Sequence, residues 1–323
     1  MGQSVIIQIE NIYYPILAIV GIPANLVTIV ILSRGRCELT KCITHYLIAM
    51  AAADLSVLIF DVILYEIKDA YFPYSFLNYT PICCVNLVLN FASVDCSVWF
   101  TVAFTFDRFV NICCQKLRQS YCTAKTASVV LALVCSFSIL QNVPIYFIYE
   151  SRKIIENLPW SCYVKSSFYT LPIWVAFFWL EAILTPFAPF VLILLFNALT
   201  IRNIVQANRV RRRLRGNSIS ENHNDPEMEI RRKSMILLLA ISGSFIILWM
   251  VTFISYLWAQ FSDSRFLEEN YNDPFTVLEQ SGYILRTLSC CINTFIYAVS
   301  QSKFRGELKK MIKRPMALIM HSL

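Results

Sequence analysis

Seven long apolar stretches, almost free of charged residues, constrain this 323-residue chain more than any other feature. A hydrocarbon layer about 30 Å thick is crossed by about 20 helical residues, and each stretch reaches that length. Because backbone groups in lipid must be hydrogen-bonded within the chain, such continuous runs predict helices. A transmembrane β-barrel would instead need many short segments of alternating hydrophobicity. The expected helices cover, approximately, residues 11–33, 43–67, 81–114, 125–149, 169–206, 230–261 and 275–300.

The composition also indicates a membrane protein. Hydrophobic residues make up 57% of the chain and charged residues 15%, against about 25% charged residues in soluble domains. That much apolar surface cannot be buried inside a soluble globule of this size. We therefore expect an all-α membrane protein, with a seven-transmembrane-helix bundle over residues 11–301 and a short cytoplasmic amphipathic helix and tail over residues 302–323.

The basic residues are sorted between the loops. Of the 28 Lys and Arg residues, 21 lie in the loops after the first, third and fifth expected helices or in the tail. Basic loops stay on the cytoplasmic side, so we expect an outside N-terminus of residues 1–10, an inside C-terminus and a multi-pass protein of the plasma membrane. The basic run 208–215 is then a membrane flank, and no nucleic acid partner is expected. Four apolar tail residues share one face of a helix that would lie on membrane lipids: Phe304, Leu308, Met311 and Ile312.

Three of the twelve cysteines fall on the expected outside, where disulfides form: Cys83, Cys84 and Cys162. If a bridge exists, Cys162 must pair with one of the other two. Cys83 shares a helix face with the polar residue Asn90, seven positions later, which favours a Cys83–Cys162 bridge and leaves Cys84 as the alternative. The sequence Asn78-Tyr79-Thr80 is a glycosylation acceptor in a loop expected outside, so Asn78 is a candidate glycosylation site.

Short motifs follow one another along the expected helices. They are Asn25, Asp54, Cys83 with Cys162, Asp107-Arg108-Phe109, Pro189, Trp249 and Asn293-Thr-Phe-Ile-Tyr297. In this order they resemble the rhodopsin-like (class A) G-protein-coupled receptors over nearly the whole chain. Finer details, such as Ala51-Ala-Ala-Asp54 and a last-helix motif without proline, resemble an orphan peptide-receptor-like group whose members respond to tryptophan and phenylalanine.

The resemblance implies a receptor rather than an enzyme. It would bind an extracellular amino-acid-like small molecule or short peptide and activate a heterotrimeric G protein through movement of the sixth helix. Ionisable groups inside a bilayer cost about 2.5–3.5 kcal/mol each, so those in the helices are expected to have a partner or a role. By family positions the ligand-binding residues are Asp61, Asn90, Glu181, Trp249, Tyr256, Glu279 and Arg286.

The resemblance also implies an ion site and a switch. An allosteric sodium ion, the one cofactor or metal expected, would lie at Asp54 with Ser97, Ser289 and Asn293 as neighbours. Asp107 would hold Arg108 in the resting state and release it to the G protein in the active state. Asn293 and Tyr297, four apart on the last helix, are further switch residues that would swing inward with activation. Tyr297 would then meet the remaining switch residue, Asn197, through water.

Departures from the family pattern give further expectations. Helix 6 carries Val251 where the family has a kink-forming proline, and Arg231 where many relatives place an acid that restrains Arg108. From the missing acid at Arg231 we expect raised basal activity, whereas the missing proline at Val251 removes a pivot that would help the helix to open. Asn90 stands where receptors for monoamines carry an acid, which argues against a simple monoamine ligand.

The roles of two charged residues stay open. Arg286, with several carboxylates around it, would hold a zwitterion or a peptide terminus by paired charges. Alternatively, it is neutralised internally by Asp61 or Glu279 and touches no ligand. Asp95 is expected to face the fourth and fifth helices, and the sequence gives it no role.

Other function classes fit less well. A seven-helix transporter or channel would show internal repeats or helices broken by glycine and proline, which this sequence lacks, and it is kept as the alternative. A retinal photoreceptor needs a lysine in the last helix, but none lies between Lys233 and Lys303. An intramembrane enzyme would need a nucleophile with its base, and no such pair is evident.

Overall fold

The computed structural model describes residues 4–151, 153–155, 157–168, 170–215, 226–261, 271 and 273–321. Over these residues it contains seven helices long and apolar enough to cross a membrane. This confirms the predicted all-α, seven-helix architecture. The spans are Val5–Ser33, Lys41–Tyr71, Thr80–Cys113, Ala124–Phe147, Pro172–Ala207, Ser234–Ala259 and Pro274–Ser300.

Several spans consist of more than one element. The second joins α2 (Lys41–Val57), the π-helical segment η1 (Leu58–Ile67) and α3 (Lys68–Tyr71), and the fifth joins α7 (Pro172–Ala182), the π-helical segment η5 (Ile183–Phe187) and α8 (Ala188–Arg215). The remaining helical elements are α1 (Val5–Ser33), η2 (Phe76–Asn78), α4 (Thr80–Cys113), α5 (Gln115–Tyr121), α6 (Ala124–Asn142), η3 (Val143–Phe147), η4 (Ser166–Phe168), α9 (Pro226–Phe261), α10 (Pro274–Ser300) and α11 (Ser302–His321).

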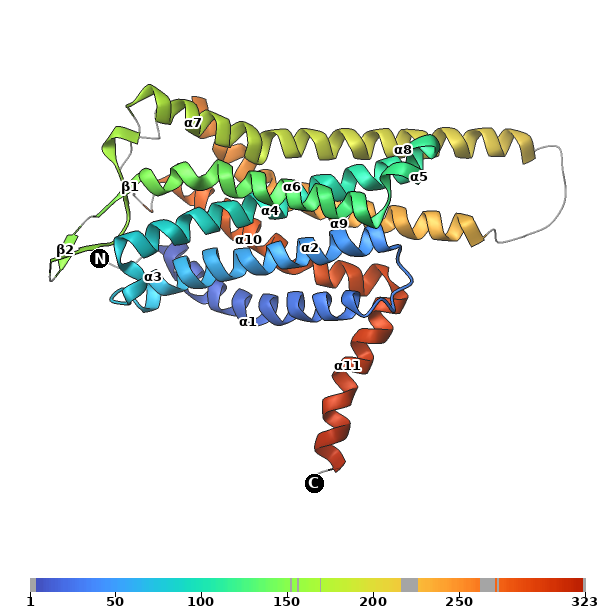
Figure 1. Ribbon diagram of the computed structural model, residues 1–323, viewed down its shortest axis with the longest axis horizontal. Helices are drawn as coiled ribbons and strands as arrows, with labels where there is room; N and C mark the ends of the chain where they lie inside the picture. The colour runs from blue at the N-terminus through green and yellow to red at the C-terminus, as the bar shows by residue number, and fades with distance from the viewer. Residues whose placement is uncertain are drawn as a thin grey trace.

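Four short strands lie between α6 and α7. Antiparallel pairs form between β1 (Tyr149–Glu150) and β4 (Tyr163–Val164), and between β2 (Lys153–Ile155) and β3 (Leu158–Trp160). The strands and the N-terminus lie at one end of the bundle, which we call the β end (Figure 1). At the opposite end, the α11 end, α11 turns away from the bundle axis (Figure 1).

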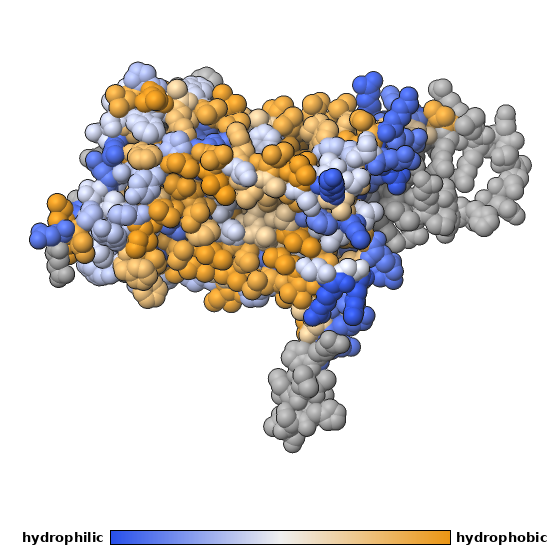
Figure 2. Space-filling model, in the orientation of Figure 1, coloured by the Kyte–Doolittle hydropathy of each residue, from blue (hydrophilic) through white to orange (hydrophobic). Residues whose placement is uncertain are grey.

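The surface has the layered hydropathy of a membrane protein. Figure 2 shows a hydrophobic band around the middle of the bundle and hydrophilic residues gathered toward both ends. The helix ends are defined by local sequence: Thr40, Thr123 and Asp273 are N-caps whose side chains accept backbone N–H bonds of α2, α6 and α10.

The first helix differs from its expected bounds. It begins at Val5, six residues before position 11, so residues 5–10 are not part of an N-terminal tail. Placing the start after the last charge, Glu10, was wrong, because a helix can carry a charged side chain in its terminal turns, where the polar interface is within reach. Ile6 is already buried against the bundle.

The buried hydrophobic residues described form three clusters: two layers within the bundle, and a smaller cluster at the β end with Cys83, Leu87, Ile145 and Ile148. The layer at the α11 end includes Tyr46, Met50, Phe104 and Tyr297, and Phe304 of α11 packs beneath it. The layer nearer the β end includes Val98, Ile193 and Trp249. Because the two layers sit above each other, a polar level between them, described below, separates the two ends of the molecule.

The helix after the seventh span is anchored by its apolar face. Leu308 and Met311 pack against the core layer at the α11 end. Ile312, expected on the same face, is 53% exposed. Charged contacts hold its polar side: Lys303 Nζ lies 2.8 Å from Glu38 Oε1, which raises the pKa of Lys303. Hydrogen bonding by Lys310 lowers the pKa of Glu307.

Candidate functional site

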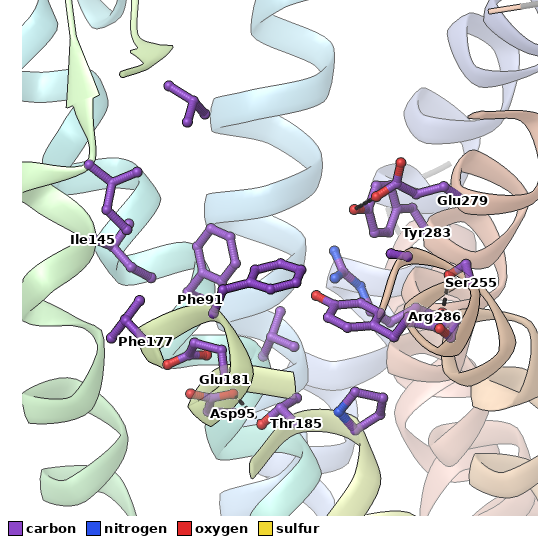
Figure 3. A pocket seen from close by; sticks show the side chains of 18 of the residues that line it. Phe91, Asp95, Ile145, Phe177, Glu181, Thr185, Ser255, Glu279, Tyr283 and Arg286 are labelled. Carbon is purple, nitrogen blue, oxygen red and sulfur yellow. Dashed lines mark hydrogen bonds between the residues drawn. The ribbon is translucent and has the colours of Figure 1, made fainter. Parts of the chain in front are cut away.

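A cavity of about 290 Å³ opens within the β half of the bundle (Figure 3). Its walls come from α4, α7, η5, α9 and α10, and β1 and β4 contribute Tyr149 and Val164. Many of its side chains are aromatic, and the charged ones are Asp95, Glu181, Glu279 and Arg286. A volume of this size is at the small end of the roughly 300–1,000 Å³ typical of ligand cavities. It therefore suits one residue-sized group.

Five of the seven predicted ligand-binding residues line this cavity: Glu181, Trp249, Tyr256, Glu279 and Arg286. The other two, Asp61 and Asn90, do not, so the expectation that they face the cavity was wrong. Both are buried behind Arg286. Arg286 Nη2 donates to Asp61 Oδ2 at 2.9 Å, and Asn90 Nδ2 donates to Asp61 Oδ1 at 2.9 Å. Arg286, which bonds Asp61, lines the cavity in their place.

The structure decides which acid neutralises Arg286. Asp61 is its ion-pair partner, whereas Glu279 Oε1 accepts a 2.8 Å hydrogen bond from Tyr283. The guanidinium carbon lies 4.9 Å from the centre of the Tyr283 ring, and the buried Nε has no hydrogen-bond partner in the described part of the chain. Arg286 thus pairs with Asp61 on the side away from the cavity, and its side chain also lines the cavity.

Asp95 is the cavity residue that sequence reasoning missed. It faces α6 and η5, as expected, where Asn142 Nδ2 donates to its Oδ2 at 2.6 Å and Thr185 Oγ1 to its Oδ1 at 2.7 Å. It also lines the cavity. Thr185 reaches it because the backbone there is extended (φ −151°, ψ 103°) just before Pro186, a local break of the kind that prolines cause. The signals in the sequence were an acid inside one expected helix, Asp95, and a proline inside another, Pro186.

One hydrogen bond and a shared small cavity connect the ligand cavity to the polar level between the core layers. Trp249 lines the cavity and its Nε1 donates to Ser289 Oγ at 3.2 Å. Ser289 in turn lines a second, small cavity of about 10 Å³ with Asp54, Ser97 and Asn293. Ser97 Oγ donates to Asp54 Oδ1 at 2.6 Å, and Asn293 Nδ2 to Asp54 Oδ2 at 2.8 Å.

The small cavity suits one water-sized particle. Asp54 is fully enclosed, and it is surrounded by hydroxyl and amide groups rather than by other acids. Carboxylate and hydroxyl oxygens are ligands for hard cations, so these residues fit the sodium ion expected there. Groups of three or more His, Cys, Asp or Glu residues, which would suit a more highly charged metal, do not occur among the described residues. Ser289 lines the cavity without bonding Asp54.

The charged pair at the α11 end is buried. Arg108 is 1% exposed and Asp107 is fully enclosed, and Arg108 Nε donates to Asp107 Oδ2 at 3.0 Å. Cys42 Sγ of α2 donates to the other oxygen, Asp107 Oδ1, at 3.1 Å. From α9, Ser234 Oγ accepts a 3.4 Å bond from Arg108 Nη1. The side chain of Arg231 lies outside the described residues.

Of the other three switch residues, Asn293 bonds Asp54, and Asn197 and Tyr297 are not joined by a hydrogen bond in the described chain. Asn197 Nδ2 donates to Ser242 Oγ at 2.8 Å, and the buried hydroxyl of Tyr297 has no partner among the residues described. The Tyr297 ring packs on Phe304 of α11, with centroids 5.9 Å apart.

At the β end, a disulfide joins Cys83 of α4 to Cys162, which follows β3. Cys84 stays free, with its sulfur 3.8 Å from that of Cys162. The bridge ties the loop that carries β1–β4 to the top of α4. It thereby fixes the strands that cover the cavity.

Asn78 is placed differently from a glycosylated residue. Its side chain is buried: Nδ2 donates to Pro73 O at 2.8 Å and Oδ1 accepts from Lys68 Nζ at 2.7 Å. A glycan on Nδ2 would need this buried side chain to leave its position between Pro73 and Lys68, so the fold argues against the predicted modification.

We expect no glycan at Asn78 in the folded protein expressed in animal cells. Removing N-glycans with a peptide glycosidase should leave the electrophoretic mobility of surface receptor unchanged, and Asn78→Gln should match the wild type in mobility. A mobility shift that Asn78→Gln abolishes would contradict this reading.

Comparison with known proteins agrees with this geometry. A profile of the family "7 transmembrane receptor (rhodopsin family)" matches residues 24–297. The chain is 23% identical to the FMRFamide receptor of Drosophila melanogaster over 90% of this chain and 51% of that receptor, so it spans about half the length of this relative. It is 22% identical to the thyrotropin-releasing hormone receptor of Gallus gallus over 90% of this chain and 75% of the relative. It is also 22% identical to chemerin-like receptor 2 of Mus musculus, over 93% and 79%.

The profile match covers most of the chain, and the family and these relatives are receptors rather than enzymes. The seven spans carry its motifs in order. This protein belongs to the rhodopsin family of seven-transmembrane receptors.

Proposed function

We propose that this protein is a G-protein-coupled receptor of the plasma membrane. A ligand from outside the cell binds in the cavity at the β end, and a heterotrimeric G protein is activated at the α11 end. The N-terminus is then outside, and α11 lies on the cytoplasmic lipid surface, in agreement with the sorting of basic residues.

The observation that carries this proposal is the link from Trp249 through Ser289 to the Asp54 level. A ligand that moves Trp249 would thereby also move Ser289, which lines the small cavity with Asp54 in the middle of the bundle. A ligand that binds one arrangement of these helices better than another shifts the population between them. On the inner side, the single 3.4 Å contact between Arg108 and Ser234 is a weak restraint on α9. Outward movement of the inner part of α9 would break it.

The ligand class is a peptide or an amino-acid-like molecule. Two of the relatives are named as receptors for peptides, FMRFamide and thyrotropin-releasing hormone, and the finer sequence details resemble receptors that respond to tryptophan and phenylalanine. The cavity volume suits one residue, so either a free aromatic amino acid or the terminal residue of a short peptide would enter it. The remainder of a peptide would lie against β1 and β4.

The test is a screen of cells expressing the receptor, read by calcium and cyclic AMP, against free amino acids and short peptides. A hit should then stimulate nucleotide exchange on Gα by the purified receptor, and Trp249→Ala should abolish the response. A protein that never stimulates exchange but moves a solute or an ion across vesicles would instead be the alternative, a seven-helix transporter or channel.

We expect sodium to stabilise the wild-type protein through Asp54. When bound, the ion supplies the positive charge that this enclosed carboxylate lacks. The purified receptor should unfold at a higher temperature in sodium chloride than in choline chloride of equal ionic strength, and Asp54→Asn should remove the difference. Equal stabilisation of the wild type by both salts would contradict a sodium site.

A further inference from the structure

The cavity has an uneven distribution of charge. Three carboxyl groups line it, from Asp95, Glu181 and Glu279, against one guanidinium, that of Arg286, among the residues described. That guanidinium is already paired with Asp61, which lies outside the cavity. Leaving Glu279 aside, the described lining still offers a ligand two carboxyl groups, those of Asp95 and Glu181.

Two of these acids form one wall. Gln141 Nε2 donates to Glu181 Oε1 at 3.0 Å and lies 3.4 Å from Asp95 Oδ2, so a single neutral amide bridges both carboxyl groups. Thr185 and Asn142 supply the other hydrogen bonds of Asp95. Within the described chain, neither acid has a cationic side chain in ion-pair distance. Uncompensated charge at this depth is costly.

The wall opposite Asp95 and Glu181 also has a polar group that a ligand could satisfy. In Figure 3, Asp95, Glu181 and Thr185 lie on one side of the space, and Arg286, Tyr283 and Glu279 on the other. The buried Nε of Arg286 is a donor without a partner in the residues described. The space between the walls is bounded by aromatic side chains, including Phe91, Phe177 and Tyr256.

We propose that Asp95 and Glu181 bind the cationic group of the ligand, an ammonium or guanidinium, whose aromatic body fills the space toward Arg286. Gln141 sets the spacing of the two acids. At the far end of the ligand, Arg286 takes a carbonyl or carboxylate oxygen. This inference deepens the proposed function and rests on it for the identity of the cavity as the ligand site.

The experiment measures binding alone, so it does not depend on coupling to a G protein. Purified full-length receptor in lipid nanodiscs is titrated with three probes that share one aromatic body: 2-phenylethylamine, L-phenylalaninamide and 3-phenylpropanoate. Thermal stabilisation of the receptor is the readout. The two amines should stabilise it, the amide at lower concentration because it also offers a carbonyl to Arg286, and the carboxylate should not.

Variants then locate the cation. Glu181→Gln and Asp95→Asn should each raise the half-saturating amine concentration by about tenfold or more, since each removes a charge-assisted bond. Glu150→Gln, the same change on an exposed β1 residue that does not line the cavity, is the matched control and should bind like the wild type. Each variant must first show wild-type elution and unliganded melting. Should one acid variant fail to fold, the other carries the test.

Three results would overturn the proposal: stabilisation by 3-phenylpropanoate equal to that by the amines, no stabilisation by either amine, or a loss in Glu279→Gln as large as in Glu181→Gln. The last result would mean that the whole cavity attracts cations without a defined subsite. A receptor that binds the amines as expected but never stimulates exchange on Gα would leave the subsite standing and contradict the proposed signalling function.

Discussion

Replacing Asp61 with asparagine is expected to remove most folded receptor from the cell surface. The carboxylate is 4% exposed and accepts bonds from both Arg286 and Asn90. Without it, the guanidinium is left inside the bundle with no acid at ion-pair distance among the described residues. Removing one partner of a buried ion pair typically costs about 3–5 kcal/mol, which is a large part of the stability of an ordinary domain. Surface labelling and the melting temperature of purified protein measure the loss.

A double variant separates charge pairing from ligand binding. In Asp61→Asn with Arg286→Gln both charges are gone, and much of the lost stability should return, because replacing a whole buried pair is often close to neutral. Agonist potency of the double variant is then compared with that of the wild type at equal surface density. A lower potency would mean that Arg286, besides pairing with Asp61, also contacts the ligand. Wild-type surface levels of Asp61→Asn alone would refute the structural role of the pair.

The architecture was within reach of the sequence because a bilayer leaves few choices. Charge-free runs of sufficient length must be helices. The resemblance to the rhodopsin-like receptors then implied that Ser97 and Asn293 are neighbours of Asp54, and the structure places both within hydrogen-bond distance of it. The start of α1 was misplaced, since an absence of charge marks the hydrocarbon layer and not the end of a helix.

The ligand cavity was harder to predict because helix rotation and side-chain reach decide what lines it. Asp61 and Asn90 are on the right faces, yet the long side chain of Arg286 covers them. Asp95 is held at the cavity by Thr185, whose backbone is extended. The helical periodicity of the sequence, about 3.6 residues per turn, does not predict such a break in a helix. Similarly, Asn78 matches an acceptor sequence, but a contact with Lys68 ten residues earlier buries it.

Replacing Asp107 with asparagine should raise the ligand-free activity of the receptor by about tenfold, a change that corresponds to about 1.4 kcal/mol in the balance of resting and active states. Arg108 loses its one acid partner among the described residues, and the hydrogen bond that the described part of α9 makes to it is that of Ser234. An acid at that position should have the opposite effect, because it would tie Arg108 to α9 by a buried ion pair. Ser234→Glu is therefore expected to lower ligand-free activity. Nucleotide exchange on Gα by equal amounts of purified receptor measures both.

Asp107→Asn and Ser234→Glu are expected to change ligand-free activity in opposite directions, so together they test the role of Arg108. Misfolding lowers activity, so it cannot produce the rise expected for Asp107→Asn. For Ser234→Glu, the matched control Ser234→Ala removes the 3.4 Å contact without adding a charge and should raise activity slightly. Cys42→Ala, which frees Asp107 Oδ1 without changing its charge, should give a rise smaller than that of Asp107→Asn, because the Arg108–Asp107 pair remains. If Asp107→Asn and Ser234→Glu moved ligand-free exchange in the same direction, Arg108 would not be the group that restrains α9.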